Sequence, residues 1–79
     1  MPNPASTGPM HEGDYLVHEQ EDGQFALYDY ATRRDNGDPR RRFPDGKQAW
    51  EAARTLASQS GGTYWRSNWK TPETIEPFE

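Results

Sequence analysis

The sequence contains no cysteine and no long apolar run. In a chain of 79 residues, the absence of Cys excludes a disulfide framework, a thiolate nucleophile and a Cys-ligated zinc site. No stretch reaches the roughly 18 apolar residues that a membrane span requires, and the N-terminus lacks the charged and then apolar pattern of a secretion signal. We therefore expect a soluble, cytoplasmic protein without a membrane partner.

Aliphatic residues are also scarce. Leu, Ile, Val and Phe together supply 8 of the 79 residues, below the roughly 20 % at which disorder becomes the default expectation. Three Trp and four Tyr compensate, because each buried aromatic ring removes about 150–250 Å² from water. The composition therefore predicts one small domain with a thin core that depends on aromatic side chains.

Charge is distributed unevenly along the chain, although the net charge is only −4. Residues 1–30 contain six Asp and Glu and no Lys or Arg. Residues 31–47 hold six of the nine Lys and Arg against three Asp, and residues 48–79 carry three Lys and Arg against four Glu. The negative and positive charges are therefore concentrated in different segments, so the net charge alone does not indicate whether the chain binds an acidic or a basic partner.

Proline and glycine mark both ends of the expected domain. Residues 1–12 combine Pro and Gly with small polar residues and predict a flexible leader. Residues 71–79 contain two Pro and three Glu and predict an acidic tail, although Ile75 and Phe78 could dock onto the domain. A single α+β domain is therefore expected over residues 13–70.

The dipeptide Asp22-Gly23 predicts a β-hairpin. It separates two short segments, residues 14–20 and 24–30, that are rich in Tyr, Val, Leu and Phe. A two-residue type I′ turn at Asp22-Gly23 places Gln20 opposite Phe25. Neither face of this hairpin is purely polar, so the sequence leaves the core side open; the favoured arrangement has Leu16, Phe25 and Leu27 facing the core.

Asn36-Gly37 predicts a second hairpin, and Pro39 confines the strand that follows to a sheet edge or to a late start. This hairpin would gather five guanidinium groups on one projecting ribbon. They belong to Arg33, Arg34, Arg40, Arg41 and Arg42. Such a ribbon is suited to phosphate or acidic-partner contact, whereas the alternative is charge pairing within this acidic chain.

A helix is predicted between Asp45 and Gly61. Asp45 is a favourable N-cap, Gln48 completes a capping-box pattern, and Gly61 ends the helix. One apolar stripe runs along this segment, formed by Ala49, Trp50, Ala53, Leu56 and Ala57. Residues 63–69 predict a closing strand. The order β-β-β-α-β predicts an α+β fold in which one helix packs on a small antiparallel sheet of three to four strands.

These segments resemble the small bacterial DUF2188-type domain. The resemblance rests on three features: the segment from Tyr15 through Phe25-Ala26-Leu27, the Ala-rich helix after Asp45, and Gly61-Gly62 before a strand. It covers about residues 15–66 and implies the same α+β layout, but that family has no established activity to carry over. The Arg-rich segment and the Trp-rich end depart from the family pattern.

Side chains that support catalysis or metal binding are few. Imidazole is supplied by His11 and His18, and His18 is expected to play a structural part in a strand. The serines lack the Gly-x-Ser-x-Gly pattern of a nucleophile elbow. We therefore expect no catalytic residues, no metal and no cofactor, and a protein that is not an enzyme.

Ten aromatic residues exceed what so small a core can bury, so some are expected at the surface. Trp, Tyr and Arg are also the residue types enriched at interface hot spots. The residues predicted to bind a partner are Tyr28, Tyr30, Tyr64, Trp65, Arg66 and Trp69. They favour a non-enzymatic protein-binding module, monomeric or weakly dimeric.

In its small size, acidity and lack of site chemistry, the chain is similar to phage or mobile-element inhibitors of host defence, including anti-CRISPR proteins. This general resemblance implies an inhibitor that works in the cytoplasm of the host cell by occluding the surface of a defence complex. The alternative is a nucleic-acid-binding protein that uses the arginine ribbon.

Overall fold

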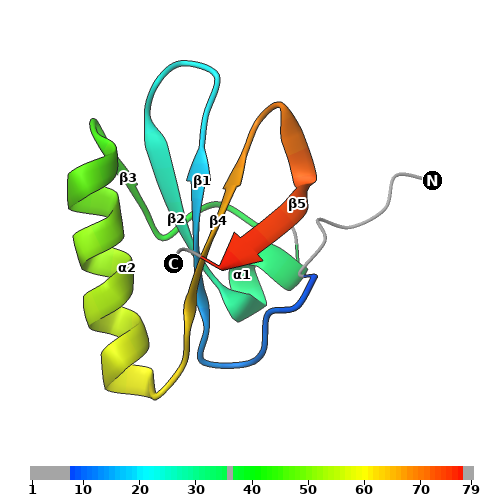
Figure 1. Ribbon diagram of the computed structural model, residues 1–79, viewed down its shortest axis with the longest axis vertical. Coiled ribbons are helices and arrows are strands. Elements are labelled where there is room, and N and C mark those ends of the chain that lie inside the picture. Colours follow the sequence, from blue (N-terminus) through cyan, green and yellow to red (C-terminus); the bar gives the residue numbers. More distant parts are fainter. Residues whose placement is uncertain (1–7, 36, 78–79) are drawn as a thin grey trace.

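The computed structural model describes residues 8–35 and 37–77, and it has the predicted α+β architecture (Figure 1). This part of the chain forms five strands and two helices. In order they are β1 Tyr15–Glu19, β2 Phe25–Asp29, α1 Tyr30–Arg34, β3 Arg41–Phe43, α2 Gly46–Ser60, β4 Tyr64–Asn68 and β5 Thr71–Pro77. Figure 1 shows α2 on one side of the sheet and α1 on the other.

The sheet is mixed, and its strand order is β3-β2-β1-β4-β5. Neighbouring strands are antiparallel except for β1 and β4, which run parallel in the centre. The expectation of a purely antiparallel sheet is wrong at this pair. The physical reason is that α2 carries the chain back across the sheet between β3 and β4, and a crossover of this length allows parallel pairing.

The β1–β2 hairpin has a register different from the one predicted. Phe25 pairs with Glu19 rather than with Gln20. The loop has three residues, because the Gln20 N–H donates to the Gln24 carbonyl and the Gly23 N–H donates to the Gln20 carbonyl. Gly23 has a φ of 88°, as expected for the left-handed position that closes a three-residue loop.

The shifted register moves side chains to the opposite face of the sheet, because neighbouring side chains alternate. Val17 is buried beside Leu27 on the α2 side, whereas Leu16 is buried on the other side. The prediction that Leu16 shares a face with Leu27 is therefore wrong. Both faces of β1 are covered, which explains why the strand sequence has apolar residues at neighbouring positions rather than an alternation of apolar and polar residues.

Helix α2 forms as predicted. The Asp45 carboxylate accepts a hydrogen bond from the Gln48 N–H at 2.9 Å, and Gly61 caps the C-terminal end with a φ of 74°. Three alanines face the sheet and are buried, namely Ala49, Ala53 and Ala57. Because alanine is small, the helix packs closely on Val17, Leu27 and Phe43. A Cβ at Gly62 would collide with the Gly13 carbonyl, so this second glycine lets the chain enter β4 beside β1.

Helix α1 takes the place of the predicted second hairpin. The Asp29 carboxylate caps it by accepting hydrogen bonds from the Thr32 N–H at 2.7 Å and from the Thr32 hydroxyl. At the other end, the Gly37 N–H donates to the Thr32 carbonyl and turns the chain back toward β3. Asn36 lies outside the described residues. The hairpin prediction is wrong because the cap at Asp29 ends β2 before the Asn-Gly dipeptide is reached.

Strand β5 begins at Thr71, where an acidic tail was expected. The Asn68 side chain accepts hydrogen bonds from the Lys70 and Thr71 backbone N–H groups, which closes a tight turn and brings β5 against β4. An edge strand tolerates proline because one row of its N–H groups makes no ladder bonds.

Residues 1–7 of the expected leader and residues 78–79 of the expected tail lie outside the described residues. Within the expected leader, Met10 is buried.

Candidate functional site

The aromatic residues predicted to bind a partner do not form one patch. Tyr28 and Trp65 both pair with Leu16, so they lie on the sheet face away from α2. Tyr64 packs against the core on the α2 side, and Arg66 pairs with Val17 on that same side. Tyr30 lies in α1. The set is therefore divided among both faces of the sheet, helix α1 and the turn between β4 and β5, which carries Trp69.

Trp65 is tied into the fold. Its indole N–H donates to the Asp14 carboxylate at 3.0 Å, and Asp14 is only 5 % exposed. Burial alone would raise the pKa of Asp14, but hydrogen bonds from the Thr63 and His11 backbones and from Trp65 lower it. This carboxylate links the segment before β1 to the start of β4. The contacts of Trp65 are those of a structural residue.

Tyr28 belongs to a half-buried group on the same face. Its ring meets His18 edge-on at 6.5 Å between centroids, and the guanidinium carbon of Arg33 lies 5.6 Å from its ring centroid. His18 Nδ1 and the Ser67 hydroxyl are 2.7 Å apart, which joins β1 to β4. Burial lowers the pKa of His18, and the charge of Arg33 lowers it further against the opposing effect of Glu19.

The five arginines predicted to form a ribbon are dispersed. Arg33 is 7 % exposed in α1. Arg34 pairs with Asp35 at 3.0 Å and Arg40 pairs with Asp29 at 3.0 Å, so two of the remaining charges meet carboxylates of the same chain. Arg41 stacks on Phe43, with its guanidinium carbon 4.9 Å from the ring centroid. Arg42 is exposed in β3.

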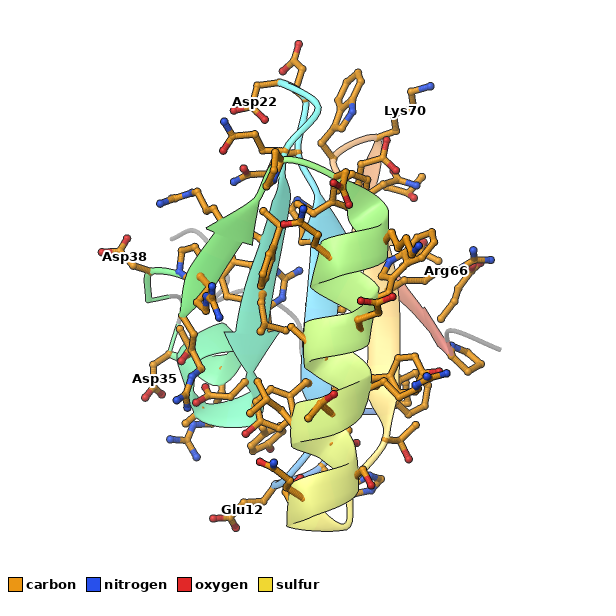
Figure 2. All side chains as sticks on the ribbon, turned by 90° about the vertical axis from the view of Figure 1, so that its left-hand side faces the viewer. Glu12, Asp22, Asp35, Asp38, Arg66 and Lys70 are labelled. Carbon is orange, nitrogen blue, oxygen red and sulfur yellow. The ribbon has the colours of Figure 1, made fainter. Side chains whose placement is uncertain are left out.

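Trp69 is the exposed large hydrophobic side chain of the described residues, at 41 % of its full area. It lies in the turn between β4 and β5, and its backbone N–H donates to the Glu19 carbonyl at 3.0 Å. The Lys70 ammonium lies 5.6 Å from its ring centroid. Figure 2 shows Lys70 at the same end of the molecule as Asp22 of the β1–β2 loop. The ring is thus held outward on a turn with an ordered backbone.

A groove of about 350 Å³ lies between α2 and the β4–β5 hairpin, and its lining includes Asn68 and Thr71 at the two ends of the turn that carries Trp69. Phe25 and Trp50 form its aromatic side and meet edge-on at 6.3 Å between centroids. On the other side, Arg66 and Glu76 form an ion pair at 3.4 Å. Glu19 lies between these two sides in the sheet, since its strand neighbours are Phe25 and Asn68.

The partner-binding residues predicted from the sequence include Arg66 of this groove and Trp69 of the nearby turn, but not the other residues of the groove named above. Glu19, Phe25 and Trp50 come from three different elements, and only the register of β1 places Glu19 on the α2 side. The available signal was the loop length at Glu21-Asp22-Gly23, because a three-residue loop gives this register. Hereafter the Trp69 surface means Trp69 together with the groove residues Glu19, Phe25, Trp50, Arg66 and Glu76.

Three further findings concern the molecule as a whole. Within residues 8–35 and 37–77, no helix is both long and apolar enough to cross a membrane. Over the same part of the chain, no three His, Asp or Glu side chains gather closely enough to hold a metal ion. Comparison with protein-family models, with curated proteins and with solved structures finds no match to this chain.

Proposed function

We propose that the protein is a non-enzymatic module that binds a protein partner through the Trp69 surface. It acts by covering part of that partner, in the manner of the small phage or mobile-element inhibitors that the chain resembles. The observation that carries the proposal is Trp69, a large ring left 41 % exposed on a turn whose backbone is held by hydrogen bonds.

The energetic case rests on burial of this ring. Covering its exposed part would remove roughly 100 Å² from water, worth about 2 kcal/mol before the costs of association. That is roughly a thirtyfold gain in affinity from one side chain. Because the turn is already ordered, little further entropy is lost on binding. Tryptophan is also one of the residue types enriched at interface hot spots.

The same geometry favours a protein over a nucleic acid as partner. Glu19 lines the groove and makes no ion pair in the described part of the chain, so it would repel phosphate there, whereas Glu76 is already paired with Arg66. The arginines that the alternative requires are divided among a buried site, two internal ion pairs and the β3 edge. Phosphate binding draws its affinity from accessible positive charge, which this arrangement reduces.

The test is capture of a partner by immobilised full-length protein, with Trp69→Ala as the variant. We expect proteins retained by the wild type to be lost from Trp69→Ala, with an unchanged unfolding transition because Trp69 does not belong to the core cluster or to the side chains packed against it. Tyr30→Ala is the matched control, since it removes another predicted aromatic that lies in α1, away from the Trp69 surface. Equal retention by the wild type and Trp69→Ala would show that the surface is wrong.

A retained partner that belongs to a host defence complex would support the inhibitor role. In that case the wild type should inhibit the isolated complex and Trp69→Ala should not.

A further inference from the structure

We infer that the groove of the Trp69 surface receives an arginine or lysine side chain of the protein partner, with Glu19 as its counter-ion. This inference rests on the proposed function and names the chemistry that the partner presents. Three observations carry it: the part of the sheet that α2 leaves open, the pairing of the charges around the groove, and the position of the aromatic rings.

The open part of the sheet follows from its strand order. Helix α2 packs on β1, β2 and β3, and less extensively on β4. Figure 2, viewed from the α2 side, shows β5 lying beyond the helix. At the position of Glu19, the register aligns one residue from each of four neighbouring strands on the same face of the sheet, namely Phe25, Glu19, Asn68 and Thr71. The groove therefore has apolar residues near α2 and polar residues toward the edge.

The charges around the groove leave one carboxylate available. Glu76 is paired with Arg66 at 3.4 Å. The Asn68 side-chain oxygen is occupied by the Lys70 and Thr71 N–H groups at 2.9 and 3.1 Å. Glu19 is exposed and makes no ion pair within residues 8–35 and 37–77. A cation entering the groove would thus meet Glu19 without first displacing an existing partner.

The aromatic rings near Glu19 suit a cation as well. Phe25 is its direct cross-strand neighbour, and Trp50 packs edge-on against Phe25. Aromatic ring faces attract ammonium and guanidinium groups within about 6 Å of the centroid. Lys70 already occupies this position over Trp69. A guanidinium group combines ring stacking with two hydrogen bonds to one carboxylate, so arginine fits the site best.

Longer-range charge acts in the same direction. Glu21 and Asp22 lie in the loop next to Glu19, and the first 30 residues contain no Lys or Arg. Although Lys70 lies at the same end of the molecule (Figure 2), the two loop carboxylates add negative potential beside Glu19, which raises the association rate of a basic partner. A basic segment of the partner would therefore be guided toward the end of the molecule where the groove opens.

The test is an NMR titration of the full-length protein with two small probes, N-acetyl-arginine amide and N-acetyl-citrulline amide. The probes have nearly the same shape, but citrulline is uncharged. We expect the arginine probe to shift the signals of Glu19, Phe25 and Trp50 in a saturable way at millimolar concentration, with about tenfold weaker binding of the citrulline probe. Glu19→Gln should reduce the arginine affinity by a similar factor.

Glu12→Gln is the matched control, because it makes the same change of charge at the end of the molecule opposite Lys70 (Figure 2). It should bind the arginine probe as the wild type does. The inference is overturned if the two probes bind equally, if no saturable shift occurs in the groove, or if Glu19→Gln and Glu12→Gln behave alike. Partner capture through Trp69 is read separately. If a partner is captured through Trp69 but the arginine probe does not bind, the proposed function stands and the inference about the groove fails. If the arginine probe binds but no partner is captured through Trp69, the proposed function alone fails.

Discussion

At the scale of single residues, His18 shows how burial and neighbouring charge act on one side chain. It is half-buried against Tyr28, its Nδ1 lies 2.7 Å from the Ser67 hydroxyl, and the charge of Arg33 lies close enough to lower its pKa. Burial is the largest cause of this lowered pKa, and only Glu19 acts in the opposite direction. The folded state therefore prefers the neutral ring.

This preference makes the free energy of unfolding depend on pH. A His whose pKa is lowered by folding contributes stability above its unfolded pKa of about 6.5, and this stability is lost as the pH falls through the folded pKa. We expect the free energy of unfolding, measured in urea, to fall between about pH 8 and pH 5, and to fall less in His18→Gln. Equal pH slopes in the two proteins would contradict this assignment. The lowered pKa values of Asp14 and Asp29 act at more acidic pH, where both proteins should lose stability alike.

At the scale of secondary structure, α1 depends on its N-cap. Helices this short gain little from their own hydrogen bonds, and Asp29 supplies both the cap to Thr32 and an ion pair with Arg40. Burial would raise the pKa of Asp29, but its bonds to Thr32 and Arg40 lower it. Asp29 therefore joins the end of β2, helix α1 and the approach to β3.

Replacing this cap should destabilise the element. We expect Asp29→Ala to lower the free energy of unfolding by about 1 kcal/mol or more and to speed hydrogen exchange at the amides of α1. Asp35→Ala is the matched control, because it also removes an aspartate that pairs with an arginine, but from an exposed position at the C-terminal end of α1. It should have a clearly smaller effect. Similar losses in the two variants would mean that the cap does not stabilise α1.

The elements also show which structure the sequence could predict. Helix α2 was predictable because its cap, its stop and its alanine stripe are all local signals. The register of β1 was not, since Glu21-Asp22-Gly23 is compatible with loops of two or three residues, and a shift of one residue exchanges the faces. Helix α1 was missed because Asn36-Gly37 is a strong local hairpin signal that the cap at Asp29 overrides.

The site was predictable only in part for the same reason. Trp69 and Arg66 could be named because their residue types are enriched at interfaces. The groove depends on how much of a five-stranded sheet one helix covers, which no local pattern shows. It also depends on β5, and Pro72 and Pro77 led to the prediction of a tail in place of that strand. Contacts such as Glu19 with Phe25, and Glu19 with Asn68, follow from the register and topology of distant segments.

At the scale of the whole molecule, the positive charges are spread over both sides of α2, and several of them lie close to carboxylates. Asp35 and Asp38 flank the arginine-bearing side near β3, whereas Arg66 and the β4–β5 hairpin lie on the other side of α2 (Figure 2). Arg41 and Arg42 are the two arginines of the predicted ribbon that remain exposed without an ion pair in the described part of the chain. The chain as a whole has a net charge of −4.

This arrangement predicts weak binding to duplex DNA or RNA. The two exposed arginines of the β3 edge neutralise at most about two phosphates, so their contribution to the slope of log affinity against log salt should be no steeper than roughly −2. In a mobility-shift titration at low salt we expect no shift of a random-sequence duplex at micromolar protein. A shift that disappears steeply with salt and is lost in the double variant Arg41→Ala, Arg42→Ala would make the β3 edge a nucleic-acid contact and would overturn the choice of a protein partner. Because those substitutions lie far from Trp69 in the sheet order, they should leave capture of a protein partner unchanged.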